Sequence, residues 1–221
     1  MRSVDSDDAT TRSRIRDAAI RLFGRDGFRE TTVRAIAEDV GVSAALVIHH
    51  FGSKEGLRLA CDEYILGEVT AQGDEIGSGG PATSAAMARW LADVDVHRPW
   101  LDYISRQFTE GSPLGDRFFD DIVAYTEQMF ADGVADGTIR ESSDPHMRAV
   151  VLTAYGLSSL VFERQIGRAI GEPGLNSSTA QRITIPALEL FTHGVYTSDA
   201  LLLAAREALD RLDSDQTEGT Q

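Results

Sequence analysis

The chain is poor in the features that mark secreted, membrane and disulfide-bonded proteins. It has one cysteine, Cys61, among 221 residues, which excludes an internal disulfide. No apolar run approaches the roughly 18 residues that predict a membrane-spanning helix, and the N-terminal segment MRSVDSDDAT lacks the apolar centre of a signal peptide. We therefore expect a soluble cytoplasmic protein that does not contact a membrane.

Patterns of catalytic and cofactor-binding sites are also missing. The chain has no Gly-rich phosphate loop and no H-E-x-x-H, C-x-x-C or G-x-S-x-G pattern. The adjacent pair His49 and His50 cannot chelate one metal ion together, because neighbouring side chains on a helix diverge by about 100°. We expect no catalytic residue, no metal and no cofactor, and we keep an all-α enzyme as an alternative.

Basic residues are scarce outside the N-terminal part of the chain. Residues 9–60 hold nine Lys and Arg against six Asp and Glu, whereas residues 61–221 hold eleven against twenty-six. Because salt screens charges over about 8 Å, a locally basic segment can act on a polyanion although the whole chain carries a net charge of −14. The acidic remainder either keeps the protein off poorly fitting DNA or simply aids solubility.

The N-terminal part predicts three short helices, of which the last two form a helix-turn-helix. Apolar residues with helical spacing define the first helix, which we expect Gly24 and Gly27 to end. Thr31 or Thr32 can cap the second helix. Gly41 permits a sharp turn after it, so that the third helix can begin at once. We expect Ser43 to cap this third helix and Ser53 a fourth.

These residues resemble the N-terminal domain of the tetracycline-repressor (TetR) family. The resemblance covers Arg14 to Leu59: AAIRLFGRDGF, then TTVRAIAEDVGVS, then His50-Phe51 followed by Ser53-Lys54-Glu55. A weaker likeness lies in ADGVADGTIRESSDPHMRA, at the family's turn between its seventh and eighth helices. The resemblance implies an all-α fold, in which a DNA-binding domain is joined through a long fourth helix to a ligand-binding and dimerising body.

The remaining pattern is helical throughout and predicts four segments. They are a flexible tail (1–10), the helix-turn-helix domain (11–58), a helical effector-binding and dimerisation domain (59–213) and a disordered tail (214–221). We expect a fourth helix to about Gln72, a loop over 73–81, and helices over 83–94, 99–109, 114–136, 145–170, 178–194 (kinked or divided at Pro186) and 198–212.

By position in the family, the recognition helix is Ala44 to His50, and Arg34 is the candidate for reading a guanine edge. The alternative is that Arg34 is only a solvated charge on an exposed helix face. Ala44, Ala45 and Ile48 make this recognition helix apolar, which suits contact with thymine methyl groups. The resemblance implies phosphate contacts for the remaining candidates: Thr32, Ser43, His49, His50 and Lys54.

If the body holds a ligand pocket, as the resemblance implies, its aromatic residues are the candidates for lining it. Aromatic residues at helical spacing are more often core than pocket. The effector we expect is apolar or cationic, because aromatic rings and carboxylates both attract cations. The candidates are Trp100, Tyr103, Phe108, Tyr125 and Tyr155.

Binding to successive major grooves about 34–36 Å apart requires a homodimer on a palindromic operator of double-stranded DNA. We expect the helices over 146–170 and 178–194 to form its interface, unless their small residues Ala154, Gly156, Ser158 and Ser159 face the same subunit. The resemblance implies a repressor that a small-molecule effector releases, with drug efflux as the controlled process. The alternative is a protein-interaction module that docks through residues 44–48.

Overall fold

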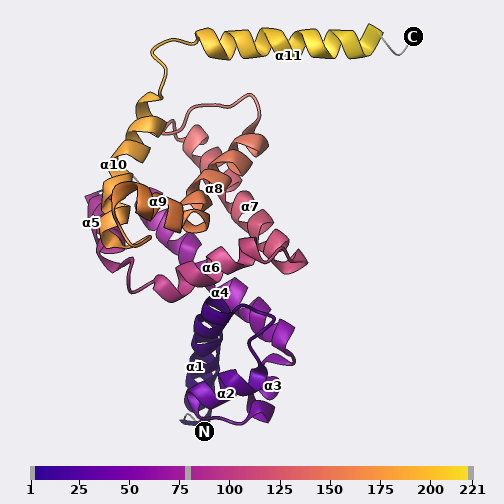
Figure 1. Cartoon of the computed structure of the whole chain (residues 1–221), viewed down its shortest axis with the longest axis vertical. Coiled ribbons are helices and arrows are strands. Elements are labelled where there is room, and N and C mark those ends of the chain that lie inside the picture. Colours follow the sequence, from indigo (N-terminus) through magenta and orange to yellow (C-terminus); the bar gives the residue numbers. More distant parts are fainter. Residues whose placement is uncertain (1–2, 78–80, 219–221) are drawn as a thin grey trace. The chain divides into compact units, whose positions relative to one another are not determined.

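The computed structural model describes residues 3–77 and 81–218 (Figure 1). These residues form helices and no strand, which confirms the all-α prediction. None of the described helices is long and apolar enough to cross a membrane. The helices are α1 (Ser3–Asp26), α2 (Val33–Val40), α3 (Ala44–Phe51), α4 (Lys54–Gly77), α5 (Pro81–Asp93), α6 (Arg98–Thr109), α7 (Pro113–Ala135), α8 (Pro145–Val161), α9 (Glu163–Ile170), α10 (Ser177–His193) and α11 (Ala200–Glu218).

Both chain ends are more helical than we predicted. Helix α1 begins at Ser3, inside the segment expected to be a flexible tail. It runs through Gly24 and ends before Gly27, whose φ is 89°. Helix α11 continues to Glu218, so that residues 214–218 of the expected C-terminal tail are also helical.

Helix α4 extends beyond the expected end at Gln72, because α7 holds its last turns. The Tyr125 hydroxyl donates hydrogen bonds to the Thr70 carbonyl at 3.0 Å and to the Asp74 carboxylate at 2.8 Å. Gly73 permits this approach, since an added Cβ would overlap the Tyr125 hydroxyl. The predicted loop over 73–81 is therefore wrong for residues 73–77 and for Pro81, while residues 78–80 lie outside the described part.

The predicted helix over 145–170 is divided at Phe162. Glu163 begins α9, and its carboxylate accepts two hydrogen bonds of 2.8 Å from the Arg98 guanidinium at the start of α6. This paired contact fixes the position where α9 begins, because arginine binds a carboxylate in one planar geometry. The predicted division at Pro186 is absent, since α10 continues through this residue.

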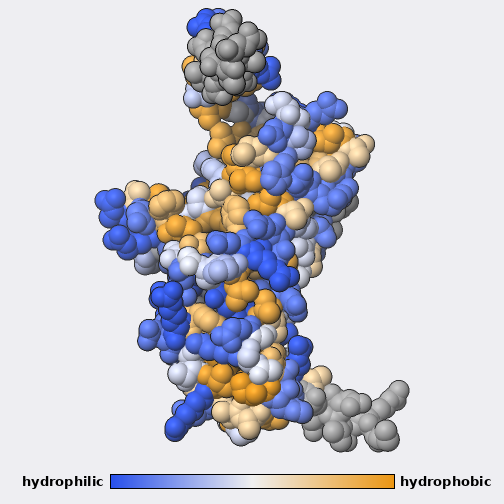
Figure 2. Space-filling model, turned by 90° about the vertical axis from the view of Figure 1, so that its right-hand side faces the viewer, coloured by the Kyte–Doolittle hydropathy of each residue, from blue (hydrophilic) through white to orange (hydrophobic). Residues whose placement is uncertain are grey.

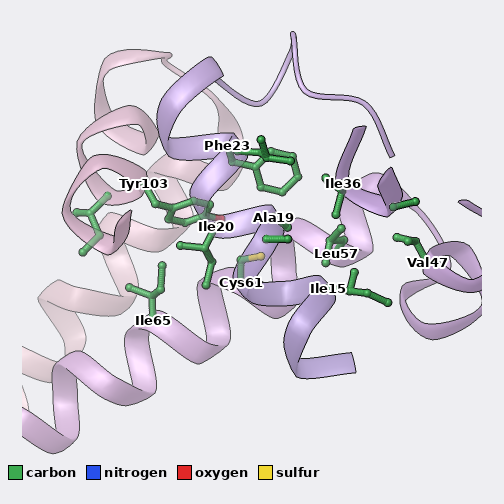
Figure 3. Packing of buried hydrophobic residues seen from close by; sticks show 14 of the residues in the cluster. Ile15, Ala19, Ile20, Phe23, Ile36, Val47, Leu57, Cys61, Ile65 and Tyr103 are labelled. Carbon is green, nitrogen blue, oxygen red and sulfur yellow. The ribbon is translucent and has the colours of Figure 1, made fainter. Parts of the chain in front are cut away.

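One continuous core joins the N-terminal helices to the body. Figure 3 shows side chains of α1, α4 and α6 converging, with Phe23, Leu57 and Tyr103 among them. Ile36 of α2 and Val47 of α3 complete the same cluster, and both are fully buried. The domain boundary predicted between residues 58 and 59 thus falls inside α4 and inside this core. The chain divides into two compact units, Met1–Ala180 and Gln181–Gln221, so this core lies within the first unit.

Gly24 allows close contact between α1 and α6, and substitution should show this. A Cβ at Gly24 would lie 2.8 Å from the Tyr103 backbone nitrogen and 3.1 Å from the Asp102 Cβ. We expect Gly24→Ala to lower the free energy of unfolding by roughly 1–3 kcal/mol through overpacking. The control is Gly67→Ala on α4, where an added Cβ meets nothing within 4 Å. It should stabilise by about 0.5–1 kcal/mol, and urea unfolding of both variants is the measurement.

Candidate functional site

Short-range hydrogen bonds shape the turn between α2 and α3. The Thr32 hydroxyl caps α2 by accepting from the Ala35 N–H at 3.1 Å, and the Ser43 hydroxyl caps α3 by accepting from the Leu46 N–H at 3.1 Å. Gly41 has a φ of 73°, a backbone conformation that favours glycine. Of the two candidate caps for α2, Thr31 has another role: it is buried, and its hydroxyl donates to the Gly27 carbonyl at 2.8 Å.

The outer face of α3 is exposed and mostly apolar. Val47 points into the core, whereas Ala44, Ala45, Ile48 and His49 are exposed. Apolar side chains are visible among hydrophilic ones at this end of the molecule (Figure 2). Small apolar side chains let a helix lie deep in a groove and touch thymine methyl groups, but they cannot read bases by hydrogen bonding.

Arg34 lies on α2, the first helix of the helix-turn-helix, and is held by an intrahelical ion pair. Its Nε is 2.8 Å from the Glu38 carboxylate, and both side chains are mostly exposed. The hydrogen bond to Glu38 raises the pKa of Arg34. Exposed ion pairs contribute little to stability, so Arg34 can leave Glu38 for a base or a phosphate at little cost.

Removing the Glu38 carboxylate should therefore favour contact between Arg34 and DNA. We expect Glu38→Gln to tighten binding to random DNA about two- to fivefold at low salt, because one negative charge leaves the surface that is predicted to face DNA. Fluorescence anisotropy on a random duplex measures the change. Glu63→Gln removes an exposed carboxylate from α4 and is the control. Equal affinities for Glu38→Gln and the wild type would contradict a DNA contact by Arg34.

Lys54 has a structural role that the sequence analysis missed. Its ammonium lies 4.4 Å from the centre of the Phe28 ring and donates a 3.3 Å hydrogen bond to the Arg29 carbonyl. Partial burial lowers the pKa of Lys54. The side chain thus joins the start of α4 to the turn after α1, and its phosphate contact remains a prediction. His50 is half-buried, with its ring 5.7 Å from that of His49.

A buried polar network joins α4 to α6 and α7. Arg58 of α4 donates to the Gln107 side-chain oxygen and, at 2.8 Å, to the hydroxyl of Ser112, which caps α7. Its guanidinium also lies 4.7 Å from the centre of the Phe28 ring. Arg58 is 3% exposed and Gln107 is 4% exposed. The network therefore connects the turn that follows α1 with the helices of the body.

Asp62 is the acidic member of this network. Its Oδ1 accepts hydrogen bonds from the Tyr103 hydroxyl at 2.6 Å and from the Gln107 amide at 2.8 Å. Burial raises the pKa of Asp62 to about 6, although the hydrogen bond from Tyr103 and the charge of Arg58 act against the shift. Burial also raises the pKa of Tyr103, which therefore keeps its proton and donates at neutral pH. Sequence spacing does not signal this set, because its hydrogen bonds join residues that lie 41 to 54 positions apart.

Gln107 also lines a cavity in the body. The cavity has a volume of about 430 Å³ and is bounded by residues of α6, α7 and α8 and of the turn between α6 and α7. This volume lies within the range of small-molecule sites. Asp116 and Asp120 are exposed, so the cavity opens to the surface beside them. The lining residues are Gln107, Phe108, Gly111, Gly115, Asp116, Phe119, Asp120, Ala154, Leu157, Ser158, Val161 and Phe162.

Of the five aromatic candidates, only Phe108 lines this cavity. Trp100 lines a separate, smaller cavity of about 200 Å³. Tyr103 is buried in the core, where its hydroxyl binds Asp62, and Tyr125 binds the end of α4. Tyr155 is 42% exposed on α8 and does not line the cavity. Sequence spacing missed Phe119, Phe162 and the two carboxylates, because helical periodicity does not separate core from cavity.

Comparison with known proteins identifies the class and the family. Residues 15–61 match the family profile described as bacterial regulatory proteins, tetR family, and residues 95–197 match the tetracyclin repressor-like C-terminal domain. The chain is similar to the HTH-type transcriptional regulatory protein RaaS of Mycobacterium tuberculosis, with 36% identity over 205 residues, covering 91% of this chain and 92% of that protein. The chain is therefore a helix-turn-helix transcriptional regulator, and it belongs to the TetR family.

Solved structures share the fold. A TetR-family transcriptional regulator from Agrobacterium tumefaciens matches with a TM-score of 0.61 and 19% identity, over 84% of this chain and 99% of that one. FadR from Bacillus subtilis, solved in complex with stearoyl-CoA, matches with a TM-score of 0.61 and 14% identity, over 83% of this chain and 99% of that one. A shorter match is the regulator BetI of Brucella anthropi, 45% identical over 81 residues, which is 37% of this chain and 40% of that protein.

Proposed function

We propose that this regulator is a repressor that binds a palindromic operator as a homodimer and is released by a small molecule bound in the 430 Å³ cavity. One observation carries the proposal. Gln107 lines the cavity and accepts a hydrogen bond from Arg58, whose guanidinium lies against Phe28 beside the DNA-binding helices. A ligand that displaces Gln107 therefore acts directly on α4, which follows the recognition helix α3.

The energetics of release require only a small difference in affinity. The protein has one conformation that binds DNA and one that does not. The effector must bind the second conformation more tightly than the first, by about 1–3 kcal/mol of binding free energy. Loss of one buried hydrogen bond to a charged group is of this size, about 1.5–3 kcal/mol. A shift of α4 then changes the separation of the two recognition helices, which must match the spacing of the operator.

Exposed apolar residues on α8 support the dimer. Met147, Val151 and Tyr155 follow one another at intervals of four residues and are 52%, 56% and 42% exposed. This spacing places them on one face of the helix. Of the small residues expected at the interface, Ala154 and Ser158 line the cavity, whereas Gly156 faces open space. Helix α10 also carries exposed apolar residues: Ile185, Leu188 and Phe191.

The test is binding of the full-length protein to the DNA that flanks its own gene, followed by fluorescence anisotropy in a salt series. With about six to ten phosphate contacts, the affinity should fall roughly 10³–10⁵-fold between about 50 and 200 mM salt. Binding should saturate at two or four subunits per site. The flanking DNA is chosen because, on the basis of the family resemblance, we propose that the regulator controls drug efflux and that the efflux gene lies beside its own.

Variants separate the roles within the DNA-binding surface. We expect Arg34→Ala to lose preference for the operator over random DNA, and Lys54→Ala to weaken binding to both equally. Because Lys54 also contacts Phe28 and Arg29, the thermal stability of the Lys54→Ala variant must be measured alongside its DNA binding. Salt-tolerant binding to a protein through the apolar face of α3, with no operator found in a genome-wide selection, would instead favour the interaction module.

A further inference from the structure

We infer that the cavity among α6, α7 and α8 binds an organic cation with an apolar body, for which Asp116 and Asp120 supply the counter-charge. This inference rests on the proposed function, since it names the chemical class of the effector. Three observations support it: the cavity has apolar walls, its charged lining residues are all acidic, and the nearby Arg58 is already hydrogen-bonded to other side chains.

The walls suit a flat or branched apolar ligand. Phe108 and Phe119 lie edge to face, with ring centres 6.0 Å apart. Leu157 and Val161 of α8 and Phe162, which follows α8, are also on the cavity wall. Aromatic faces attract cations in addition to burying apolar surface. The cavity volume of about 430 Å³ is sufficient for a small drug-sized molecule.

The charged groups of the lining have one sign. Asp116 and Asp120 are one helical turn apart on α7, and the lining contains no Lys, Arg or His. Within the described part of the chain, neither carboxylate side chain has a hydrogen bond or an ion pair. Two unpaired carboxylates at an apolar cavity attract a cation and repel an anion of the same shape.

The arginine that lies behind the cavity wall does not offset these charges. Arg58 donates to Gln107 and Ser112, and its charge also acts on the buried Asp62. Its guanidinium is thus engaged within the polar network, and Gln107, the network member that lines the cavity, carries no charge. A bound cation that competes for the Gln107 oxygen would weaken the hydrogen bond from Arg58.

The test uses two probes of matched shape and opposite charge, tetraphenylphosphonium and tetraphenylborate, with the full-length protein in isothermal titration calorimetry. We expect the cation to bind at one site per subunit at least tenfold more tightly than the anion. Asp116→Asn/Asp120→Asn should weaken cation binding about tenfold or more and narrow the difference between the probes. The control Glu63→Gln/Glu141→Gln removes two exposed carboxylates outside the lining and should leave cation binding unchanged.

Equal or tighter binding of tetraphenylborate, failure of both probes to bind, or an unchanged affinity in the Asp116→Asn/Asp120→Asn variant would overturn the inference. These outcomes are independent of DNA binding, which is measured without a probe. A protein that binds its operator but prefers the anion remains a candidate repressor with another effector. If the cation binds through Asp116 and Asp120 but the affinity for the operator does not change, the cation site is confirmed and the proposed mechanism of release is wrong.

Discussion

Asp62→Asn is expected to stabilise the protein at pH 7.5 by roughly 3 kcal/mol, and this gain should disappear near pH 4. The reason is the burial of Asp62, which raises the pKa of its carboxyl group to about 6. The native state therefore binds a proton more tightly than the unfolded chain does. That contribution to stability is fully present below about pH 4 and is lost as the pH rises through 6.

Asparagine keeps the hydrogen bonds and removes the charge. Both the Tyr103 hydroxyl and the Gln107 amide donate to Oδ1, for which the asparagine carbonyl oxygen substitutes. Urea unfolding of the two proteins at several pH values between 4 and 8 measures the difference. Asp120→Asn, at an exposed position, is the control and should stay within about 0.5 kcal/mol of the wild type. A less stable Asp62→Asn variant at pH 8 would show that the network requires the ionised carboxylate.

Arg58→Met should have the opposite effect, a loss of about 3 kcal/mol at neutral pH. Methionine keeps most of the aliphatic stem but removes the donors to Gln107 and Ser112. The side-chain oxygen of the buried Gln107 then loses its donor, whereas the Ser112 hydroxyl still accepts from the Gly115 N–H. It also removes the positive charge that lowers the pKa of Asp62. The ionised Asp62 therefore becomes more costly to bury when its basic neighbour is absent.

A double-mutant cycle tests this account. In the Asp62→Asn background, Arg58→Met should cost less than in the wild type, because no buried carboxylate is left without a cation. Arg25→Met, at an exposed arginine near the end of α1, is the control and should have little effect in either background. Equal costs of Arg58→Met in both backgrounds would contradict the proposed interaction between Arg58 and Asp62.

The helix-turn-helix was predictable because its determinants are short-range. Thr32, Gly41 and Ser43 each act on groups within five residues along the chain, so the residue types alone indicate the caps and the turn. The end of α4 was not predictable in this way. Its last turns are held by Tyr125, about fifty residues further on, which overrides the helix-breaking tendency of Gly73.

The candidate sites divide along the same line. The family resemblance placed the exposed residues of α3 and Arg34 on one surface. It could not show that Arg34 pairs with Glu38 or that Lys54 packs on Phe28. In the body, the choice among aromatic residues depended on which helix each one meets, and only Phe108 lines the larger cavity. The polar network was missed, because burial of its charged groups depends on contacts between distant segments.

The shared core has a consequence for how the molecule folds. Phe23 of α1, Leu57 of α4 and Tyr103 of α6 belong to one packed cluster, which also includes Ile36 and Val47 of the helix-turn-helix (Figure 3). An excised fragment that ended near residue 60 would expose the faces of α1 and α4 that α6 covers. The helix-turn-helix domain is thus not an autonomous folding unit. It should unfold in one cooperative transition together with the helices that line the cavity.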